Sequence, residues 1–96
     1  MKKKIPQSAK VVIIGGGVAG CSVAYHLSKF GWKDIVLIER DQLTSGTTWH
    51  AAGLIGQLGS SATITKLRNY SLNLYKKLEK ETGLSTGLKQ NGSLTV

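Results

Sequence analysis

Two short apolar runs flank an amphipathic segment in the first forty residues. Val11–Ile14 and Ile35–Ile38 are continuous and mostly β-branched, a pattern typical of strands that are buried on both faces. Between them a helical pattern extends from about Val18 to Phe30, and Gly31 is well placed to end the helix in the left-handed conformation. A strand, a helix and a strand in this order predict a right-handed βαβ crossover with parallel strands.

The second half of the chain predicts a loop, a longer helix and the start of another strand. Residues 42–60 are rich in Thr, Ser and Gly, which favours a loop. From about Ala62 to Thr82, apolar residues recur at spacings of three and four, and Gly83 follows as a stop. The face expected to pack inward consists of Ile64, Leu67, Ser71, Leu74 and Leu78. The tail, Gly92–Val96, begins as a strand would.

These elements predict an α/β fold that is incomplete at its C-terminus. Residues 1–9 form a polar leader that we expect to be disordered. Two parallel strands and two helices cannot cover both faces of a parallel sheet. We therefore expect residues 10–96 to be the first part of a larger domain, and the 96-residue piece by itself to be unstable and inactive.

The charge of the chain is strongly positive but dispersed. Thirteen Lys and Arg face five acidic residues, which gives a formal net charge of +8. Because no aromatic residues alternate with a basic stripe, the sequence does not favour nucleic-acid binding. The chain also contains no apolar run long enough to cross a bilayer, and no spacing typical of metal ligands.

Cysteine usage and the N-terminus indicate a reducing compartment. Met1–Lys4 resembles the charged start of a signal peptide, but the apolar run of Val11–Ile14 is too short for a signal core. Cys21 has no second cysteine with which to pair. We expect a cytoplasmic protein, or one of the mitochondrial matrix if the source is eukaryotic.

A glycine-rich turn joins the first strand to the first helix. Gly15, Gly17 and Gly20 fit the pattern G-x-G-x-x-G. In a dinucleotide site the first glycine permits the tight turn, the second lets the pyrophosphate approach the backbone, and the third lets helix and strand pack closely. The N–H groups of Val18 and Ala19 would then face the phosphate charge. A glycine-rich connection without a ligand is the other interpretation of the motif taken alone.

An acidic residue at the end of the second strand strengthens the dinucleotide interpretation. Glu39 follows Gly15 by 24 positions, near the spacing at which a carboxylate meets the ribose hydroxyls of the adenosine half. A carboxylate at that place disfavours a 2′-phosphate, so NADP is the least favoured ligand. FAD and NAD share this fingerprint, and the turn alone does not choose between them.

The loop that follows resembles one protein family. Ser45–Leu54, S-G-T-T-W-H-A-A-G-L, is similar to the flavin-contacting loop of the sarcosine and dimethylglycine dehydrogenases, members of the D-amino-acid-oxidase-like family of FAD-dependent amine oxidoreductases. Leu74–Gly83 and Gln90–Leu94 are similar to the next helix and strand of those enzymes. The resemblance covers nearly all of the chain after the leader and implies a Rossmann-like FAD-binding domain.

The resemblance also implies which residues contact FAD. Beyond the three glycines, they are Val18, Ala19, Glu39, Arg40, Gly46, Thr47, Thr48, Trp49, His50, Ala51, Ala52, Gly53 and Leu54. The histidine that matches His50 is bonded to the 8α-methyl carbon of the flavin in those dehydrogenases, and the other interpretation is a loop histidine that only forms hydrogen bonds. Trp49 either stacks near the flavin or forms a wall of the pocket.

The activity implied by the resemblance is oxidation of an N-methyl amine such as sarcosine or dimethylglycine. A hydride would pass from the substrate to the flavin, and water or a tetrahydrofolate bound by a later domain would intercept the product. No catalytic residue is expected within this segment. The alternatives are an NAD-binding module and a non-catalytic regulatory subunit built on the same scaffold.

Four other residues carry simpler interpretations. We interpret Cys21 as a small residue packed beside the turn, and His26 as a surface or packing residue. We expect Tyr70 and Tyr75 to occupy packing and surface positions on the second helix.

Overall fold

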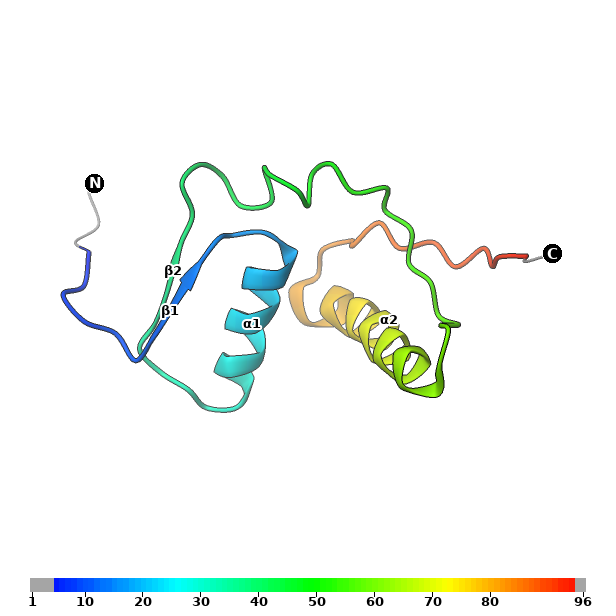
Figure 1. Ribbon diagram of the computed structural model, residues 1–96, viewed down its shortest axis with the longest axis horizontal. Coiled ribbons are helices and arrows are strands. Elements are labelled where there is room, and N and C mark those ends of the chain that lie inside the picture. The colour runs from blue at the N-terminus through cyan, green and yellow to red at the C-terminus, as the bar shows by residue number, and fades with distance from the viewer. Residues whose placement is uncertain (1–4, 95–96) are drawn as a thin grey trace. The chain divides into compact units, whose positions relative to one another are not determined.

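The computed structural model of this protein describes residues 5–94. In chain order the elements are β1 (Val11–Ile14), α1 (Val18–Lys29), β2 (Ile35–Ile38) and α2 (Ala62–Thr82) (Figure 1). Residues 39–61 connect β2 to α2 through turns and irregular backbone. Each element lies where the sequence pattern predicts it, and α1 ends one residue before the expected Phe30.

The first three elements form the predicted βαβ unit. β1 and β2 are parallel and in continuous register, from Val11 opposite Ile35 to Ile14 opposite Ile38 (Figure 1). Helix α1 packs against both strands. Gly31, with φ of +88°, reverses the chain after α1, as expected of a left-handed glycine at a helix end.

The exposure of β1 agrees with the expectation that this chain cannot cover both faces of the sheet. Val11 and Ile13 are half-buried, whereas Val12 and Ile14 are 53% and 86% exposed. Successive strand residues point to opposite faces, so one face of β1 packs toward α1 and the other has no cover among the described residues. A single crossover helix covers a single face.

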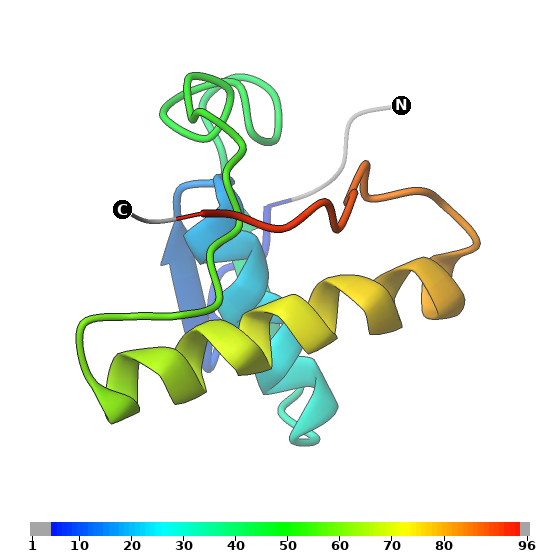
Figure 2. The same ribbon diagram turned by 90° about the vertical axis from the view of Figure 1, so that its right-hand side faces the viewer.

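Figure 2 shows α2 along its length, and both of its ends are capped. The hydroxyl of Ser61 accepts a hydrogen bond from the N–H of Ile64 at 3.2 Å. Gly83 at the C-terminus has φ of +69° and donates its N–H to the carbonyl of Glu79. A side-chain cap at the start and a left-handed glycine at the end satisfy backbone groups that the helix itself leaves unpaired.

The covered face of α2 includes part of the predicted one, because Ser71, Leu74 and Leu78 are half-buried. Thr65 accepts from the N–H of Gly59, Arg68 donates to the carbonyl of Leu58 at 2.7 Å, and the Glu79 carboxylate accepts from Thr86. The segments on either side of α2 therefore lie along the face of Thr65, Arg68, Leu72, Tyr75 and Glu79. Leu72, at 8% exposure, is the one buried hydrophobic residue in the described part of the chain.

Two apolar residues of the predicted face are exposed as a result. Ile64 is 36% exposed and Leu67 is 62% exposed. In the first turns of α2, the polar contacts of Thr65 and Arg68 therefore place the preceding segment one residue further round the helix than the predicted face.

The predicted strand near the C-terminus is not formed in the described residues. Residues 84–94 contain neither helix nor strand, and Thr95 and Val96 lie outside the described part. The leader prediction concerns residues 1–9, of which Met1–Lys4 also lie outside, and residues 5–9 carry no helix or strand. Neither described helix is long and apolar enough to cross a bilayer.

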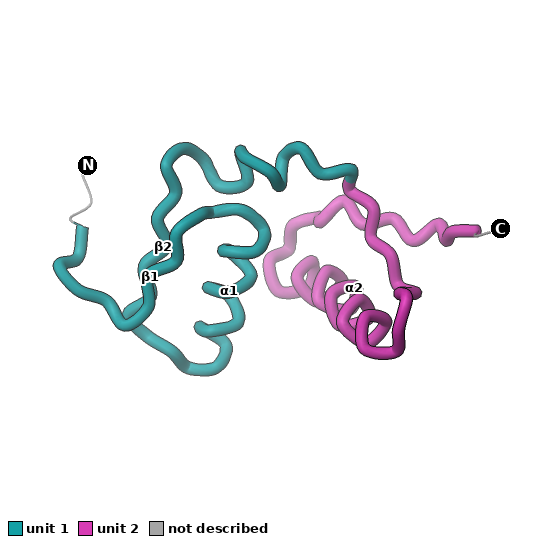
Figure 3. The backbone as a smooth tube through the Cα atoms, viewed as in Figure 1, with its two compact units in different colours: residues 1–52 teal, residues 53–96 magenta. Residues whose placement is uncertain are grey.

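The chain divides into two compact units. The first, residues 1–52, holds the βαβ unit and the start of the long connection, and the second, residues 53–96, holds α2 and its flanking segments (Figure 3).

Candidate functional site

The glycine turn closes tightly over the end of β1. Gly15 has φ of +110°, a region that side chains rarely adopt, and its N–H donates to the carbonyl of Ile38 at 2.8 Å. A Cβ on Gly20 would collide with the carbonyl oxygen of Gly15 and would lie 3.3 Å from Ile13. The first and third glycines therefore meet the geometric requirements that the fingerprint sets for them.

Glu39 is held against the same turn by its carboxylate. The N–H of Gly16 donates to Oε1 at 2.9 Å, and the N–H of Asp41 donates to Oε2 at 2.9 Å. The hydrogen bond from Gly16, followed by that from Asp41, holds the pKa of the Glu39 carboxyl below its ordinary value. Both oxygens keep further lone pairs, so the group is an ionised acceptor already fixed in place at the carboxyl end of β2.

Gly16 is a site residue that the sequence analysis missed. It is buried, its N–H binds Glu39, and its carbonyl accepts from the N–H of Thr44 at 2.8 Å. A Cβ on Gly16 would lie 2.7 Å from Leu43 and 3.0 Å from the Glu39 side chain. The fingerprint allows any residue at this position. The only signal in the sequence was that Gly16 stands between two other glycines.

The loop after β2 returns to the start of α1. Oγ1 of Thr48 accepts from the N–H of Val18 at 2.9 Å, and a Cβ on Gly17 would lie 3.0 Å from the same oxygen. Thr44 has φ of +64°, a strained conformation for a β-branched residue. The hydrogen bond from Thr44 to Gly16 and that from Val18 to Thr48 bring two distant segments together at the ends of the parallel strands.

His50 lies in a run of tight turns that follows. The N–H groups of Trp49, His50 and Ala51 each donate to the carbonyl three residues earlier, at 3.1, 3.1 and 3.2 Å. Nδ1 of His50 lies 2.8 Å from the carbonyl oxygen of Gly46. A carbonyl can only accept, so Nδ1 carries a hydrogen, and when the ring is neutral its lone pair lies on Nε2.

The structure brings most of the predicted cofactor residues into one unit. The residues from Gly15 to Ala52 in that set all belong to the first unit, while Gly53 and Leu54 belong to the second. Arg40, Thr47, Ala51 and Ala52 are exposed, and Trp49 is 76% exposed.

The remaining candidates have local partners. Sγ of Cys21 lies 3.6 Å from the carbonyl of Gly16, so the half-buried thiol packs beside the turn. Nδ1 of His26 lies 2.7 Å from the carbonyl of Ser22. Tyr70 is exposed and Tyr75 half-buried. Within residues 5–94, no three His, Cys, Asp or Glu side chains are grouped as a metal site would need.

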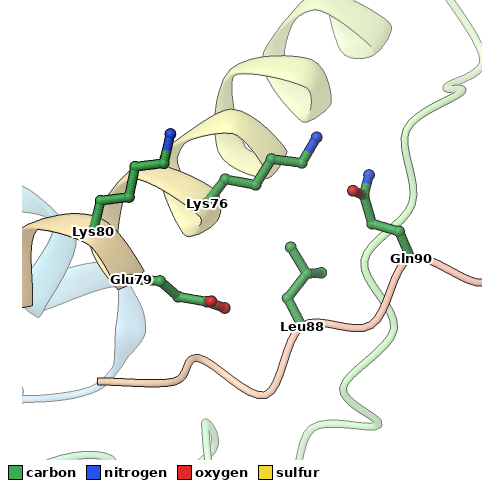
Figure 4. A pocket seen from close by; sticks show the side chains of 5 residues that line it. All are labelled: Lys76, Glu79, Lys80, Leu88 and Gln90. Carbon is green, nitrogen blue, oxygen red and sulfur yellow. The ribbon is translucent and has the colours of Figure 1, made fainter. Parts of the chain in front are cut away.

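Two shallow hollows in the second unit do not include the glycine turn. One is lined by Lys76, Glu79 and Lys80 from α2 and by Leu88 and Gln90 from the segment that follows it (Figure 4). The other is lined by Leu54, Ile55, Gly56, Arg68, Ser71 and Tyr75. The groups suited to a dinucleotide, the Glu39 carboxylate and the Thr48 hydroxyl, lie instead against the backbone of the glycine turn and the start of α1.

Comparison with known proteins gives one family and several close relatives. Residues 10–96 match the family described as FAD dependent oxidoreductase. The chain is 49% identical over 92 residues to the mitochondrial pyruvate dehydrogenase phosphatase regulatory subunit of Mus musculus. It is 51% identical over 88 residues to the mitochondrial dimethylglycine dehydrogenase of Homo sapiens, and 48% over 95 residues to the mitochondrial sarcosine dehydrogenase of Homo sapiens.

These matches cover nearly all of this chain but little of each relative. They extend over 96%, 92% and 98% of the chain, in the order given above. In each case the chain spans 10% of the relative's length.

Proposed function

This chain belongs to the FAD dependent oxidoreductase family, and we propose that it is the FAD-binding segment of an amine dehydrogenase or oxidase. The observation that carries the proposal is the convergence of three groups at the carboxyl ends of β1 and β2. These are the glycine turn, the Glu39 carboxylate and the hydroxyl of Thr48. In open α/β sheets, ligands bind at this edge.

The residues present suit the two polar parts of FAD. The bare Cα of Gly17 and the N–H groups at the start of α1 suit a pyrophosphate, which the helix dipole attracts. Glu39, ionised and fixed by two backbone donors, suits the ribose hydroxyls of the adenosine half. Because a carboxylate repels a 2′-phosphate, the site favours a ligand without one.

We assign His50 as the residue that tethers the flavin. Its Nδ1–H is held by Gly46, so Nε2 is the nitrogen that carries a lone pair for a bond to the 8α carbon. The ring is exposed and stands on a loop ordered by successive turns. The alternative is a histidine that binds FAD through hydrogen bonds only.

The substrate class we propose is an N-methyl amine of the sarcosine or dimethylglycine type. Two relatives are named dehydrogenases of these two amines, and their identity to this chain supports the assignment. When bound, the flavin would supply the hydride acceptor, and the protein would orient and tune it. Groups that hold the amine, and any domain for tetrahydrofolate, belong to parts of the protein beyond residues 10–96. The names of these three relatives include the word mitochondrial, which supports a mitochondrial location if the source is eukaryotic, and the matrix is the compartment we propose.

A regulatory subunit on the same scaffold is the second candidate. It is supported by the relative at 49% identity that is named a phosphatase regulatory subunit, since one fold can serve different roles. An NAD-binding module would need the glycine turn and Glu39 but leaves the loop of residues 46–54 without a role.

Anaerobic reduction of the full-length protein separates these candidates. Under the proposal, the bound flavin loses its yellow colour on addition of sarcosine or dimethylglycine, and glycine, which lacks the N-methyl group, leaves the colour unchanged. A flavin that dithionite reduces but neither amine reduces would favour the regulatory candidate. A colourless protein would refute FAD binding.

A further inference from the structure

The turn that follows α1, residues 29–33, carries two exposed aromatic side chains, and we call it the aromatic turn. Phe30, the C-cap residue of α1, is 76% exposed, and Trp32 is 50% exposed. Phe and Trp carry large apolar surfaces and normally bury most of them in a core or an interface. Two such side chains within three positions of the sequence therefore mark a surface that can bind an apolar partner.

The aromatic turn is held in one conformation by its backbone. The N–H of Trp32 donates to the carbonyl of Leu27 at 3.0 Å, and the N–H of Gly31 donates to the carbonyl of Ser28 at 3.1 Å. With Gly31 at φ of +88°, these two bonds form the Schellman motif that ends many helices. Because this backbone is already ordered, binding through the two aromatic side chains costs little further conformational entropy.

Lysines surround the two aromatic residues. Lys29 and Lys33 flank the aromatic pair in the sequence, and both are exposed. The N–H of Lys10 donates to the carbonyl of Asp34 at 3.0 Å, which brings the exposed Lys10 beside the same turn. The Lys29 ammonium lies 5.5 Å from the centre of the Tyr25 ring, a contact that keeps its positive charge. Three lysines against one acidic residue, Asp34, make this surface cationic.

The aromatic turn and the glycine turn lie at opposite ends of the βαβ unit (Figure 1). Because β1 and β2 are parallel, the glycine turn follows the carboxyl end of β1, whereas the aromatic turn leads to the amino end of β2. An occupant of the aromatic turn therefore leaves free the edge at which we propose that FAD binds.

A bilayer with anionic lipids matches this combination of side chains. Trp is enriched at the level of the lipid head groups, apolar rings enter the boundary with the acyl chains, and lysines are attracted by the negative surface potential. A single-stranded nucleic acid fits less well, because its binding needs a groove in which aromatic residues follow the strand. Two aromatic residues on one turn do not form such a groove.

We propose that the aromatic turn, together with Lys10, attaches this protein to the surface of a bilayer that contains anionic phospholipids. Phe30 and Trp32 enter the region between head groups and acyl chains, and the lysines stay among the head groups. Attachment of this kind needs no membrane-spanning helix. The inference goes beyond the proposed FAD-binding function and does not depend on it.

The test measures cosedimentation of the full-length protein with phosphatidylcholine vesicles, made with and without phosphatidylglycerol as the anionic lipid. We expect binding to the anionic vesicles that salt weakens, and much weaker binding to phosphatidylcholine alone. Phe30→Ala/Trp32→Ala should lower the partition coefficient on anionic vesicles by about tenfold or more, since two aromatic side chains no longer leave water. The matched control is Leu84→Ala, at an apolar residue of the second unit that is 71% exposed, and it should stay within about twofold of wild type.

Charge variants give a second measurement. Lys29→Gln/Lys33→Gln should also lower the partition coefficient by about tenfold or more, because two charges near the lipid surface are removed. Lys89→Gln, at an exposed lysine of the second unit, is its matched control and should stay within about twofold of wild type. Both double variants should unfold at the wild-type temperature, which separates loss of binding from loss of the fold.

Failure of the wild-type protein to bind the anionic vesicles would overturn the proposal, because the aromatic turn would then be covered by the rest of the protein or have no affinity for lipid. Binding that both double variants retain would overturn it too, since another surface would hold the lipid. Equal binding to both kinds of vesicle would refute the role of the lysines. Binding to a single-stranded oligonucleotide that the double variants lose, without binding to vesicles, would assign the turn to nucleic acid instead. A wild-type protein without flavin would refute the proposed function and leave the vesicle result unchanged.

Discussion

At the scale of single residues, the site depends on where side chains are missing. Gly15, Gly17 and Gly20 were predictable, because the fingerprint sets a separate geometric requirement for each. Gly16 was not, since the pattern leaves that position open and only the structure shows Glu39 and Leu43 against it. The hydrogen bonds that Glu39 and Thr48 accept could not be predicted from the sequence either. Their donors are backbone N–H groups, which every residue except proline carries.

Gly20 is predicted to tolerate no side chain. In Gly20→Ala the new Cβ would meet the main-chain carbonyl of Gly15, which cannot turn aside as a flexible side chain would. We expect a loss of about 1–3 kcal/mol of folding free energy, typical of overpacking, together with loss of bound flavin. Chemical denaturation of the full-length protein measures the first. Gly46→Ala is the matched control, because a Cβ there meets nothing within 4 Å; equal stability of the two variants would contradict the prediction.

The lowered pKa of Glu39 predicts a pH dependence. A carboxyl whose folded pKa lies below its unfolded value contributes stability above the unfolded pKa, and that contribution is lost as the pH falls through the folded one. Wild type should therefore be more stable than Glu39→Gln at neutral pH, and the difference should shrink below the ordinary pKa of a glutamate. Denaturation midpoints of both proteins across that range test this. A difference that stays constant with pH would refute it.

At the scale of elements, the sequence predicted where the helices and strands lie along the chain, and it predicted the covered face of α2 only in part. The bounds of α2 follow from Ser61 and Gly83, which cap its two ends. The covered face followed in part: Ser71, Leu74 and Leu78 are half-buried as expected. Ile64 and Leu67 are exposed, because Thr65 and Arg68 hold the preceding segment through polar contacts that apolar periodicity does not register. The runs of β1 and β2 predicted two strands correctly, and the expectation that this chain cannot cover both faces of the sheet holds for the described residues.

The cap of α2 can be tested in isolation from the cofactor site. Ser61→Ala removes the acceptor of the Ile64 N–H, and we expect a loss of about 1 kcal/mol. Ser60→Ala, one residue earlier and exposed, is the matched control and should change stability by less than about 0.5 kcal/mol. The comparison is made by thermal unfolding of the full-length protein. A Ser61→Ala variant as stable as the control would show that the cap contributes nothing.

At the scale of the whole molecule, the described residues include the sheet edge at which we propose that FAD binds, but they form little hydrophobic core. Leu72 is the one buried apolar side chain of the described residues, and Val12, Ile14 and Leu67 are largely exposed. The division into residues 1–9 and a domain beginning at residue 10 remains a prediction, as do the individual FAD contacts. Membership in the FAD dependent oxidoreductase family, which the loop of residues 45–54 indicated, is confirmed.

We predict that the 96-residue polypeptide does not fold cooperatively by itself. Burial of apolar surface is the main favourable term in folding. With one buried apolar residue among residues 5–94, this term does not offset the loss of backbone entropy. Circular dichroism of the isolated polypeptide should show a broad, gradual loss of signal on heating. A sharp sigmoidal transition would contradict this prediction.

The measurement that tests the central claim most directly is flavin fluorescence of the acid-denatured full-length protein after gel electrophoresis. The account predicts a fluorescent protein band in the wild type, no fluorescence on the band in His50→Ala, and a fluorescent band in His26→Ala, the variant of the other histidine in this chain. Fluorescence that persists in His50→Ala would place the bond on another residue, and flavin released into the supernatant of the wild type would show that FAD binds without a bond. The absence of flavin from both band and supernatant would contradict the account as a whole.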